Sequence, residues 1–367
     1  MQVNLNKSKI VVFRKREPLR ENEKWMLNNE PIEVVDNFNY LGTVFNYTGN
    51  FVLNQEMLVG KSLKALNALL AHTRRFPFKP KTLCQLFDSF VTSILGYACE
   101  IWGFGKSKPI ERVHLKFCKQ ILCVKTSTCS AGVYGELGRY PLYINRYVRI
   151  IKFWCKVINS SNAIVKHLYR MLLEKCNAGV KNWASNVKAL LDVYGFSYIW
   201  NGQETMNLIC FPTVFKNRVL DVFVQSWHSS VDVSNTLCTY STFKSAFEYE
   251  HNLDVLPKSL RIALSRLRLS SHPLLIETGR YGNNRTERRL RLCTFCNTGD
   301  IEDEFHFIVI CPLYTDIRKI YIDRYYYKKP SVFKFTELMN SSDDVKLLKL
   351  GKFIFKAFSI RQANVTA

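Results

Sequence analysis

The sequence contains no long apolar run. Its most apolar long window, Leu83 to Cys99, includes Asp88 and is shorter than the roughly 20 residues that a membrane-spanning helix needs. The opening stretch, MQVNLNKSKIVVFRK, holds no uninterrupted apolar segment of signal-peptide length. We therefore expect no secretion and no membrane partner, and an intracellular location in the nucleus, the cytoplasm or both.

Cysteine and acidic residues are also sparse. Twelve cysteines in 367 residues are too few for a disulfide scaffold, so we expect the thiols to be free or metal-bound in a reducing compartment. Asp and Glu total 30 against 52 Lys and Arg, which leaves a net charge of +22. This excess favours a polyanionic partner, and nucleic acid is favoured over an acidic membrane surface. The alternative is a basic surface that has no partner, which would have the same composition.

An apolar fraction of 47% is that of ordinary folded proteins, and the length suggests two or three domains. Short β-branched or aromatic runs at 10–13, 32–35 and 40–45 predict strands, and Met26-Leu27 before Asn28-Asn29 predicts one side of a hairpin. From Asn54 onward the apolar residues follow helical spacing instead. The predicted helices cover residues 54–70, about 80 to Gly103, 110–124, 142–158, 162–176, 182–194, 213–230 and 237–250. The fold class is therefore mainly α (α+β), with a small antiparallel β element at the N-terminus.

The most specific motif is Cys293-Thr-Phe-Cys296, followed after nine residues by His306 and after four more by Cys311. Three thiolates and an imidazole complete a tetrahedral zinc shell without an open position, which is the arrangement of a structural site. The turn-forming residues 297–300 would let the first two cysteines converge. The alternative is a chance Cys-x-x-Cys pair with a surface histidine.

A basic segment precedes this motif. Residues 258–291 hold nine Lys and Arg against two Glu, and their arginines alternate with apolar residues. This pattern predicts guanidinium groups that are free to contact phosphates. Binding of this kind depends strongly on salt and does not read the base sequence. The alternative is a solvated linker.

Three further patterns carry no predicted chemistry. The glycines at 132, 135 and 138 fit neither phosphate-binding fingerprint, so we interpret them as a turn. His114 and Cys118 lie one helical turn apart without a third group to orient them, which indicates structural residues rather than a nucleophile and its base. Asp343-Asp344 follows two serines before the last helix, where a helix-capping role is expected.

Several motifs together resemble the C-terminal part of a reverse transcriptase (RNA-directed DNA polymerase) of non-LTR retrotransposons, of the LINE and jockey-like type. The segments that carry the resemblance, in the family's order, are VNLNKSKIVVF at 3–13, FNYLG at 38–42, ILGYACEIWG at 94–103, IERVHLKFCKQILCVK at 110–125, VYGELGRYPL at 133–142, RLRLSSHPLLIETGRY at 266–281 and the Cys-Cys-His-Cys set. The nine residues before the histidine are a slightly longer spacing than is usual in the family.

The resemblance implies roles for individual residues. Lys7 occupies the motif lysine near the leaving pyrophosphate, and Tyr40, Leu41 and Gly42 occupy the primer-grip turn against the primer strand. From the resemblance and the basic composition together, we expect four arginines to contact phosphates: Arg280, Arg285, Arg288 and Arg289. Cys293, Cys296, His306 and Cys311 would hold the zinc of the knuckle-like module, and magnesium would be bound only by the intact parent enzyme.

The resemblance and the composition divide the chain into five parts. These are a palm remnant with a primer-grip-like hairpin (1–50), a helical thumb (51–130), a helical linker or body (131–257), the basic segment (258–291), and the Cys-Cys-His-Cys module with the terminal helices (292–367).

Polymerases of this family transfer nucleotides with two metal ions held by palm aspartates, including an aromatic-x-Asp-Asp turn upstream of the Lys7 motif. Asp343-Asp344 is the only adjacent aspartate pair and lies in the wrong order. We therefore expect a truncated fragment that binds RNA or DNA through phosphates and is inactive as a polymerase. Two alternatives remain open: a zinc-stabilised helical protein-interaction module with incidental basic charge, and an active enzyme if an upstream exon is missing.

Overall fold

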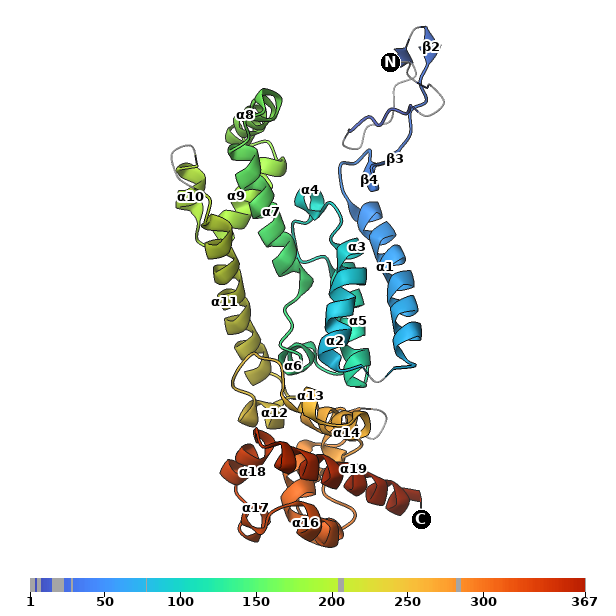
Figure 1. Ribbon diagram of the computed structural model, residues 1–367, viewed down its shortest axis with the longest axis vertical. Helices are drawn as coiled ribbons and strands as arrows, with labels where there is room; N and C mark the ends of the chain where they lie inside the picture. The colour runs from blue at the N-terminus through green and yellow to red at the C-terminus, as the bar shows by residue number, and fades with distance from the viewer. Residues whose placement is uncertain are drawn as a thin grey trace. The chain divides into compact units, whose positions relative to one another are not determined.

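The computed structural model describes residues 4, 8–14, 23–27, 29–76, 78–203, 208–281 and 285–366. The protein is mainly helical with two small antiparallel hairpins, which confirms the predicted fold class (Figure 1). It forms two compact units, neither of which is one continuous stretch of chain. Unit 1 comprises Met1–Leu70, Phe87–Val113 and Asn145–Phe215, and unit 2 comprises Ala71–Leu86, His114–Ile144 and Lys216–Ala367.

Two hairpins begin unit 1. Strands β1 (Met26–Leu27) and β2 (Glu30–Pro31) pair with each other, and β3 (Asn37–Tyr40) pairs with β4 (Thr43–Asn46). The prediction of one strand over 40–45 is wrong, because the backbone reverses between β3 and β4. Leu41 and Gly42 both have positive φ, 47° and 81°, as a tight two-residue hairpin turn requires.

The long helices of unit 1 lie where apolar periodicity predicts them, but the helix predicted from about 80 to Gly103 is interrupted at residues 96–98, where Ala98 has a φ of 50°, and a short helix at 197–201 was not predicted. The helices that lie in unit 1 entirely or in large part are α1 (Val52–Thr73), the π-helical turn η2 (Asp88–Thr92), α3 (Ser93–Leu95), α4 (Cys99–Trp102), α7 (Leu142–Ile158), α8 (Ala163–Asn177), α9 (Trp183–Val193) and α10 (Ser197–Asn201). Its core is aromatic: Trp154 is fully buried and stacks on Trp200 with ring centroids 6.1 Å apart. The indole N–H of Trp154 donates to the Tyr169 hydroxyl at 2.8 Å, so the buried donor is satisfied.

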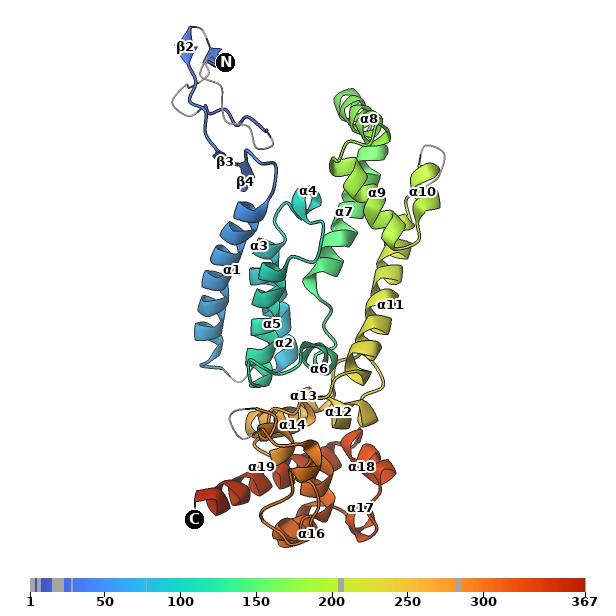
Figure 2. The ribbon, with the colours of Figure 1, turned by 180° about the vertical axis from the view of Figure 1, so that it is seen from behind.

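Two further long helices are divided between the units, namely α5 (Lys108–Leu122) and α11 (Phe211–Asp232). The elements of unit 2 are α2 (Pro80–Phe87), α6 (Ser130–Glu136), α12 (Cys238–Phe243), α13 (Asn252–Val255), α14 (Lys258–Arg268), α15 (Leu275–Thr278), η3 (Arg288–Leu290), η4 (His306–Ile310), η5 (Pro312–Tyr314), α16 (Thr315–Tyr321), α17 (Arg324–Lys328), α18 (Val332–Met339) and α19 (Asp344–Thr366). Helices α14 and α19 lie side by side in both views (Figures 1 and 2). No helix in the described ranges is both long and apolar enough to cross a bilayer.

Helix α12 is shorter than predicted. It ends at Phe243 instead of continuing to residue 250, because Lys244 leaves the helical backbone with φ −102° and ψ 92°. The Lys244 side chain is buried, and its ammonium group donates to the carbonyl oxygen of Glu248 at 2.9 Å and pairs with the Glu250 carboxylate. The residues that follow α12 thus satisfy the buried charge of Lys244 instead of extending the helix.

Two of the minor sequence predictions are confirmed. His114 is fully buried, and its Nε2 accepts a hydrogen bond from the Arg139 guanidinium at 3.0 Å, as expected of a core residue. Asp343 caps α19, since its Oδ1 accepts from the amides of Val345 at 2.8 Å and Lys346 at 2.9 Å.

The glycine stretch at 132–138 is not the turn that its composition predicted. Most of it forms α6, in which Gly132 and Gly135 allow neighbouring side chains to reach the helix backbone. A Cβ at position 135 would lie 2.7 Å from both the Trp227 ring and the Tyr240 hydroxyl. Gly132 and Gly135 therefore permit close packing against the helix and do not form a turn.

This packing gives a testable prediction. Gly135→Ala should destabilise the fold by about 1–3 kcal/mol, because the added methyl group displaces two buried aromatic side chains. Denaturant unfolding measures the loss. Gly60→Ala on α1 is the control, because its Cβ meets no atom within 4 Å, and it should leave stability unchanged or slightly increased. Gly179→Ala cannot serve as the control, because Gly179 has a φ of +80°. Equal stability of the Gly135 and Gly60 variants would contradict the close-packing role.

Candidate metal centre and the arginines beside it

The two parts of the Cys-Cys-His-Cys motif are held by separate backbone structures. Leu292 and Ile301 form an antiparallel bridge, and the amide of Cys293 donates to the carbonyl oxygen of Asp300 at 2.9 Å. The chain between them turns through Gly299, which has φ +74°, a conformation that glycine adopts without strain. This loop presents Cys293 and Cys296 on one side.

The second half of the motif is a π-helical turn. In η4 the amide of Cys311 donates to the carbonyl oxygen of His306 at 2.8 Å, five residues back, which brings His306 and Cys311 together. The buried guanidinium of Arg318 donates to the carbonyl oxygens of Ile308 at 2.7 Å and Cys311 at 2.8 Å. Arg318 thereby satisfies the carbonyl groups that the end of the turn leaves without intrahelical partners.

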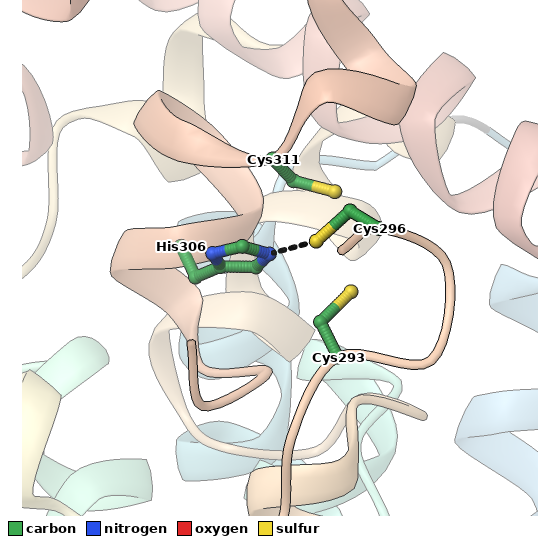
Figure 3. Close-up of side chains that lie close together, drawn as sticks. All are labelled: Cys293, Cys296, His306 and Cys311. Carbon is green, nitrogen blue, oxygen red and sulfur yellow. Dashed lines mark hydrogen bonds between the residues drawn. The ribbon is translucent and has the colours of Figure 1, made fainter. Parts of the chain in front are cut away.

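All four predicted ligands converge (Figure 3). Their donor atoms lie within 4.8 Å of one another, and 3.4 Å separates the Cys296 sulfur from Nε2 of His306. Zinc bond lengths of about 2.3 Å to sulfur and 2.0–2.1 Å to nitrogen give ligand–ligand separations of roughly 3.5–3.8 Å in a tetrahedron. The donor set and its spacing therefore fit, and the cluster could bind a structural metal such as zinc.

The electrostatics of the site suit a cation. Burial raises the pKa of the Cys311 thiol to about 12 and also raises that of Cys293, whereas at Cys296 burial is outweighed by hydrogen bonds with Thr298 and the neighbouring thiols, which lower its pKa. Burial lowers the pKa of His306, which keeps the imidazole neutral and able to donate its lone pair. A divalent ion would supply the charge that ionises the buried thiols, so its binding should release protons.

The Asp300 carboxylate lies beside the ring nitrogen of His306 that faces away from the sulfur atoms. The Nδ1 atom of His306 lies 3.5 Å from Oδ2 of Asp300, while Nε2 faces the sulfur atoms. A carboxylate on the far ring nitrogen fixes the tautomer and orientation of a metal-bound histidine. Asp300 is therefore expected to support the site without contacting the metal.

This arrangement predicts that Asp300→Asn weakens metal binding by about 10- to 100-fold, because the amide orients and polarises the imidazole less than the carboxylate does. Competition with a chromophoric zinc chelator measures the affinity. Asp316→Asn changes the same side chain on α16, which carries none of the four ligands, and this control should leave the affinity unchanged. Equal affinities of the Asp300 variant and the original chain would contradict this supporting role.

The arginines of the basic segment are not equivalent. Two are buried: Arg268 forms an ion pair with Glu136, and Arg291 donates to the carbonyl oxygens of Thr286 and Ile276 at 2.8 Å each. The expectation that the whole segment leaves its guanidinium groups free is therefore wrong for these two, because each satisfies buried acceptors that composition does not reveal.

The four arginines singled out for phosphate contact differ as well. Arg280 is half-buried, lies 2.8 Å from the Glu277 carboxylate and donates to the carbonyl oxygen of Asn235 at 2.7 Å. Arg285, Arg288 and Arg289 are exposed, and within the described part of the chain only Arg289 of these three forms an ion pair, with Glu287 at 2.7 Å. We call Arg285, Arg288 and Arg289 the exposed arginine set.

Positive charge accumulates at this point. The pKa of Arg291 is lowered by burial and, in addition, by the positive charges of Arg280, Arg285 and Arg288. The guanidinium group of Arg291 is therefore affected by three other positive charges. Through its hydrogen bonds to Thr286 and Ile276, Arg291 links the backbone of residues 286–291 to α15. The metal ligand Cys293 is two residues further along the chain.

The predicted primer-side residues lie elsewhere, in unit 1. Tyr40 and Leu41 are 58% and 74% exposed at the tip of the β3–β4 hairpin. The carbonyl oxygen of Leu41 accepts a hydrogen bond from the Tyr97 hydroxyl at 2.7 Å, and a Cβ on Gly42 would lie 3.1 Å from the Tyr97 ring. Two segments that carry the family resemblance, 38–42 and 94–103, thus meet. Lys7 lies outside the described residues.

Sequence reasoning missed Arg318 and the role of Asp300 behind His306. Asp300 belongs to a turn-forming stretch, and its spacing from His306 follows no motif that would mark it as a partner of the ligand. Arg318 follows the last ligand by seven residues on a helix with ordinary composition. Both act through the geometry of the turns that hold the ligands.

Comparison with known proteins returned no match: no protein-family model, no curated protein and no solved structure matches the chain. The resemblance to non-LTR reverse transcriptases therefore remains a prediction carried by the motif residues.

Proposed function

We propose that this chain is the nucleic-acid-gripping part of an RNA-directed DNA polymerase of the non-LTR retrotransposon type. In this proposal, zinc holds the Cys293–Cys311 module together, and the module presents the exposed arginine set to phosphates of RNA or DNA. The proposal concerns binding and assigns no nucleotide transfer to the described residues.

The choice of zinc rests on the donor set. Three cysteines and one histidine are soft and intermediate ligands of the kind that zinc favours over magnesium or calcium. Four protein ligands complete the tetrahedral shell, so no position is left for a substrate or an activated water molecule. The metal would therefore stabilise structure rather than catalyse a reaction.

The single observation that carries the binding proposal is the exposure of three arginines within five residues, just before the metal ligand Cys293. Like charges this close in the chain repel one another, so an anion that several of them can share would be bound favourably. Both side chains of the Arg289–Glu287 ion pair are exposed to solvent, so its replacement by a phosphate contact costs little.

The test compares two triple variants of the full chain. R285Q/R288Q/R289Q should weaken binding to an RNA–DNA duplex and make the slope of log K against log salt shallower by about 2.7, since each lost phosphate contact contributes about 0.9. K319Q/K328Q/K329Q removes the same charge from exposed positions on α16 and at the end of α17. It should change the slope much less.

Unchanged affinity of the arginine variant would contradict the proposal. That result would favour the alternative function, a metal-stabilised helical module that binds other proteins and whose basic charge is incidental.

A further inference from the structure

The connection between α1 and α2 has a basic and aromatic sequence, and the two helices that it joins are labelled in Figure 1. Its sequence from residue 73 to 81 is TRRFPFKPK, and no acidic residue occurs between Glu56 and Asp88. Arg74, Arg75, Lys79 and Lys81 are all exposed. We call these four residues, together with Phe76 and Phe78, the basic–aromatic loop.

The four cations of this loop have no protein partner within the described ranges. None of their side chains forms an ion pair or donates a hydrogen bond there, in contrast to Arg268, Arg280 and Arg291. Four like charges within eight residues repel one another, so a polyanion that bridges them would be bound favourably. The charge complementarity points to an anionic ligand with several regularly spaced charges.

The same loop exposes two phenylalanines. Phe76 is 60% exposed and Phe78 is 37% exposed, and both lie among the four cations. Their ring centroids lie 5.8 Å apart with the planes at 52°, so the two rings are tilted and not stacked on each other. The amide of Phe76 donates to the carbonyl oxygen of Thr73 at 3.2 Å, and buried Pro80 begins α2, which anchors both ends of the loop.

Aromatic faces among phosphate-binding cations match one class of ligand. Single-stranded nucleic acid offers unpaired bases that stack on aromatic rings and phosphates that follow the same path. A duplex cannot use the rings in this way, because its bases are already stacked on one another. A membrane anchor would need a broader apolar face than two side chains supply.

We infer that the basic–aromatic loop is a binding site for single-stranded nucleic acid, with bases stacked on Phe76 and Phe78 and phosphates on the four cations. This surface is distinct from the exposed arginine set, and the inference does not depend on the metal or on the proposed function.

The test measures binding of the full chain to a fluorescent oligothymidylate by anisotropy. F76A/F78A should bind at least tenfold more weakly, since stacking on one ring contributes a factor of roughly 5 to 150. F76Y/F78Y keeps both rings and should bind like the original chain. F333A removes a phenylalanine that is 73% exposed on α18, and it should have no effect.

The charges are tested separately. R74Q/R75Q/K79Q/K81Q should make the salt slope for the oligothymidylate shallower by about 2.8, because each phosphate contact to a single strand contributes about 0.7. All the substituted side chains are exposed, so thermal unfolding of every variant should match that of the original chain.

Three results would overturn the inference: oligothymidylate binding that F76A/F78A leaves unchanged, an equal loss for a duplex of the same length, or a loss seen only with phosphatidylserine vesicles. The last would assign the loop to anionic membranes. The R285Q/R288Q/R289Q variant, measured on the same ligands, separates failure of this inference from failure of the proposed function.

Discussion

Removal of the metal should unfold the module between Cys293 and Cys311. Structural zinc sites contribute on the order of 10 kcal/mol or more to folding, which exceeds what so short a segment obtains from its own core. Cys311 is fully buried and Cys293 nearly so, and without a cation their thiols would lie together in a space from which water is excluded. A chelator should therefore lower the melting temperature of the purified chain and abolish binding that depends on the exposed arginine set.

The Cys311→Ser variant should reproduce the effect of chelation and lose the metal measured by elemental analysis. Cys99→Ser is a matched control, because Cys99 is also fully buried but belongs to unit 1, whereas the four ligands belong to unit 2. The control should retain one metal ion per chain and its sensitivity to the chelator. A chain purified without metal that melts identically with and without chelator would contradict the structural role.

Loss of Arg268 is expected to have the second largest effect. Its side chain is fully buried; the guanidinium lies 2.8 Å from the Glu136 carboxylate and 2.9 Å from that of Glu250, and donates to the carbonyl oxygen of Met339 at 2.9 Å. Arg268→Met keeps the volume but leaves the buried Glu136 charge without its partner. Breaking a buried ion pair on one side costs about 3–5 kcal/mol, which denaturant unfolding would measure.

The double variant R268M/E136L separates the cost of the unpaired Glu136 charge from the loss of the ion pair itself. It removes both charges of the pair, while Glu250 keeps the Lys244 ammonium as a partner. We expect the double variant to be more stable than R268M alone, because no unpaired charge remains at position 136. A single variant within about 1 kcal/mol of the original chain would show that the ion pair contributes little.

The helices and the metal ligands could be predicted because their signals are local. Apolar spacing marks α7, α8, α9 and most of α11, and the order of cysteines and histidine marks the cluster. In each case the decisive residues lie within a few turns or one short motif, where periodicity and ligand spacing act directly.

The missed features depend on residues far apart in the chain. Position 135 of α6 requires glycine because Trp227 and Tyr240 occupy the space that a Cβ would fill, which no local propensity indicates. Arg268 and Arg291 share a segment with Arg288, yet the first two are buried and the third is exposed. Net charge counts all three alike, so composition alone overestimates how much of the basic segment can meet a polyanion.

The most direct measurement is the salt dependence of nucleic-acid binding by the intact, metal-loaded chain. Equilibrium binding to an RNA–DNA duplex over a several-fold range of salt should give a slope of log K against log salt of about −3 or steeper, as three or more phosphate contacts require. A slope near zero, or no binding at low salt, would contradict the assignment of this protein to nucleic-acid binding.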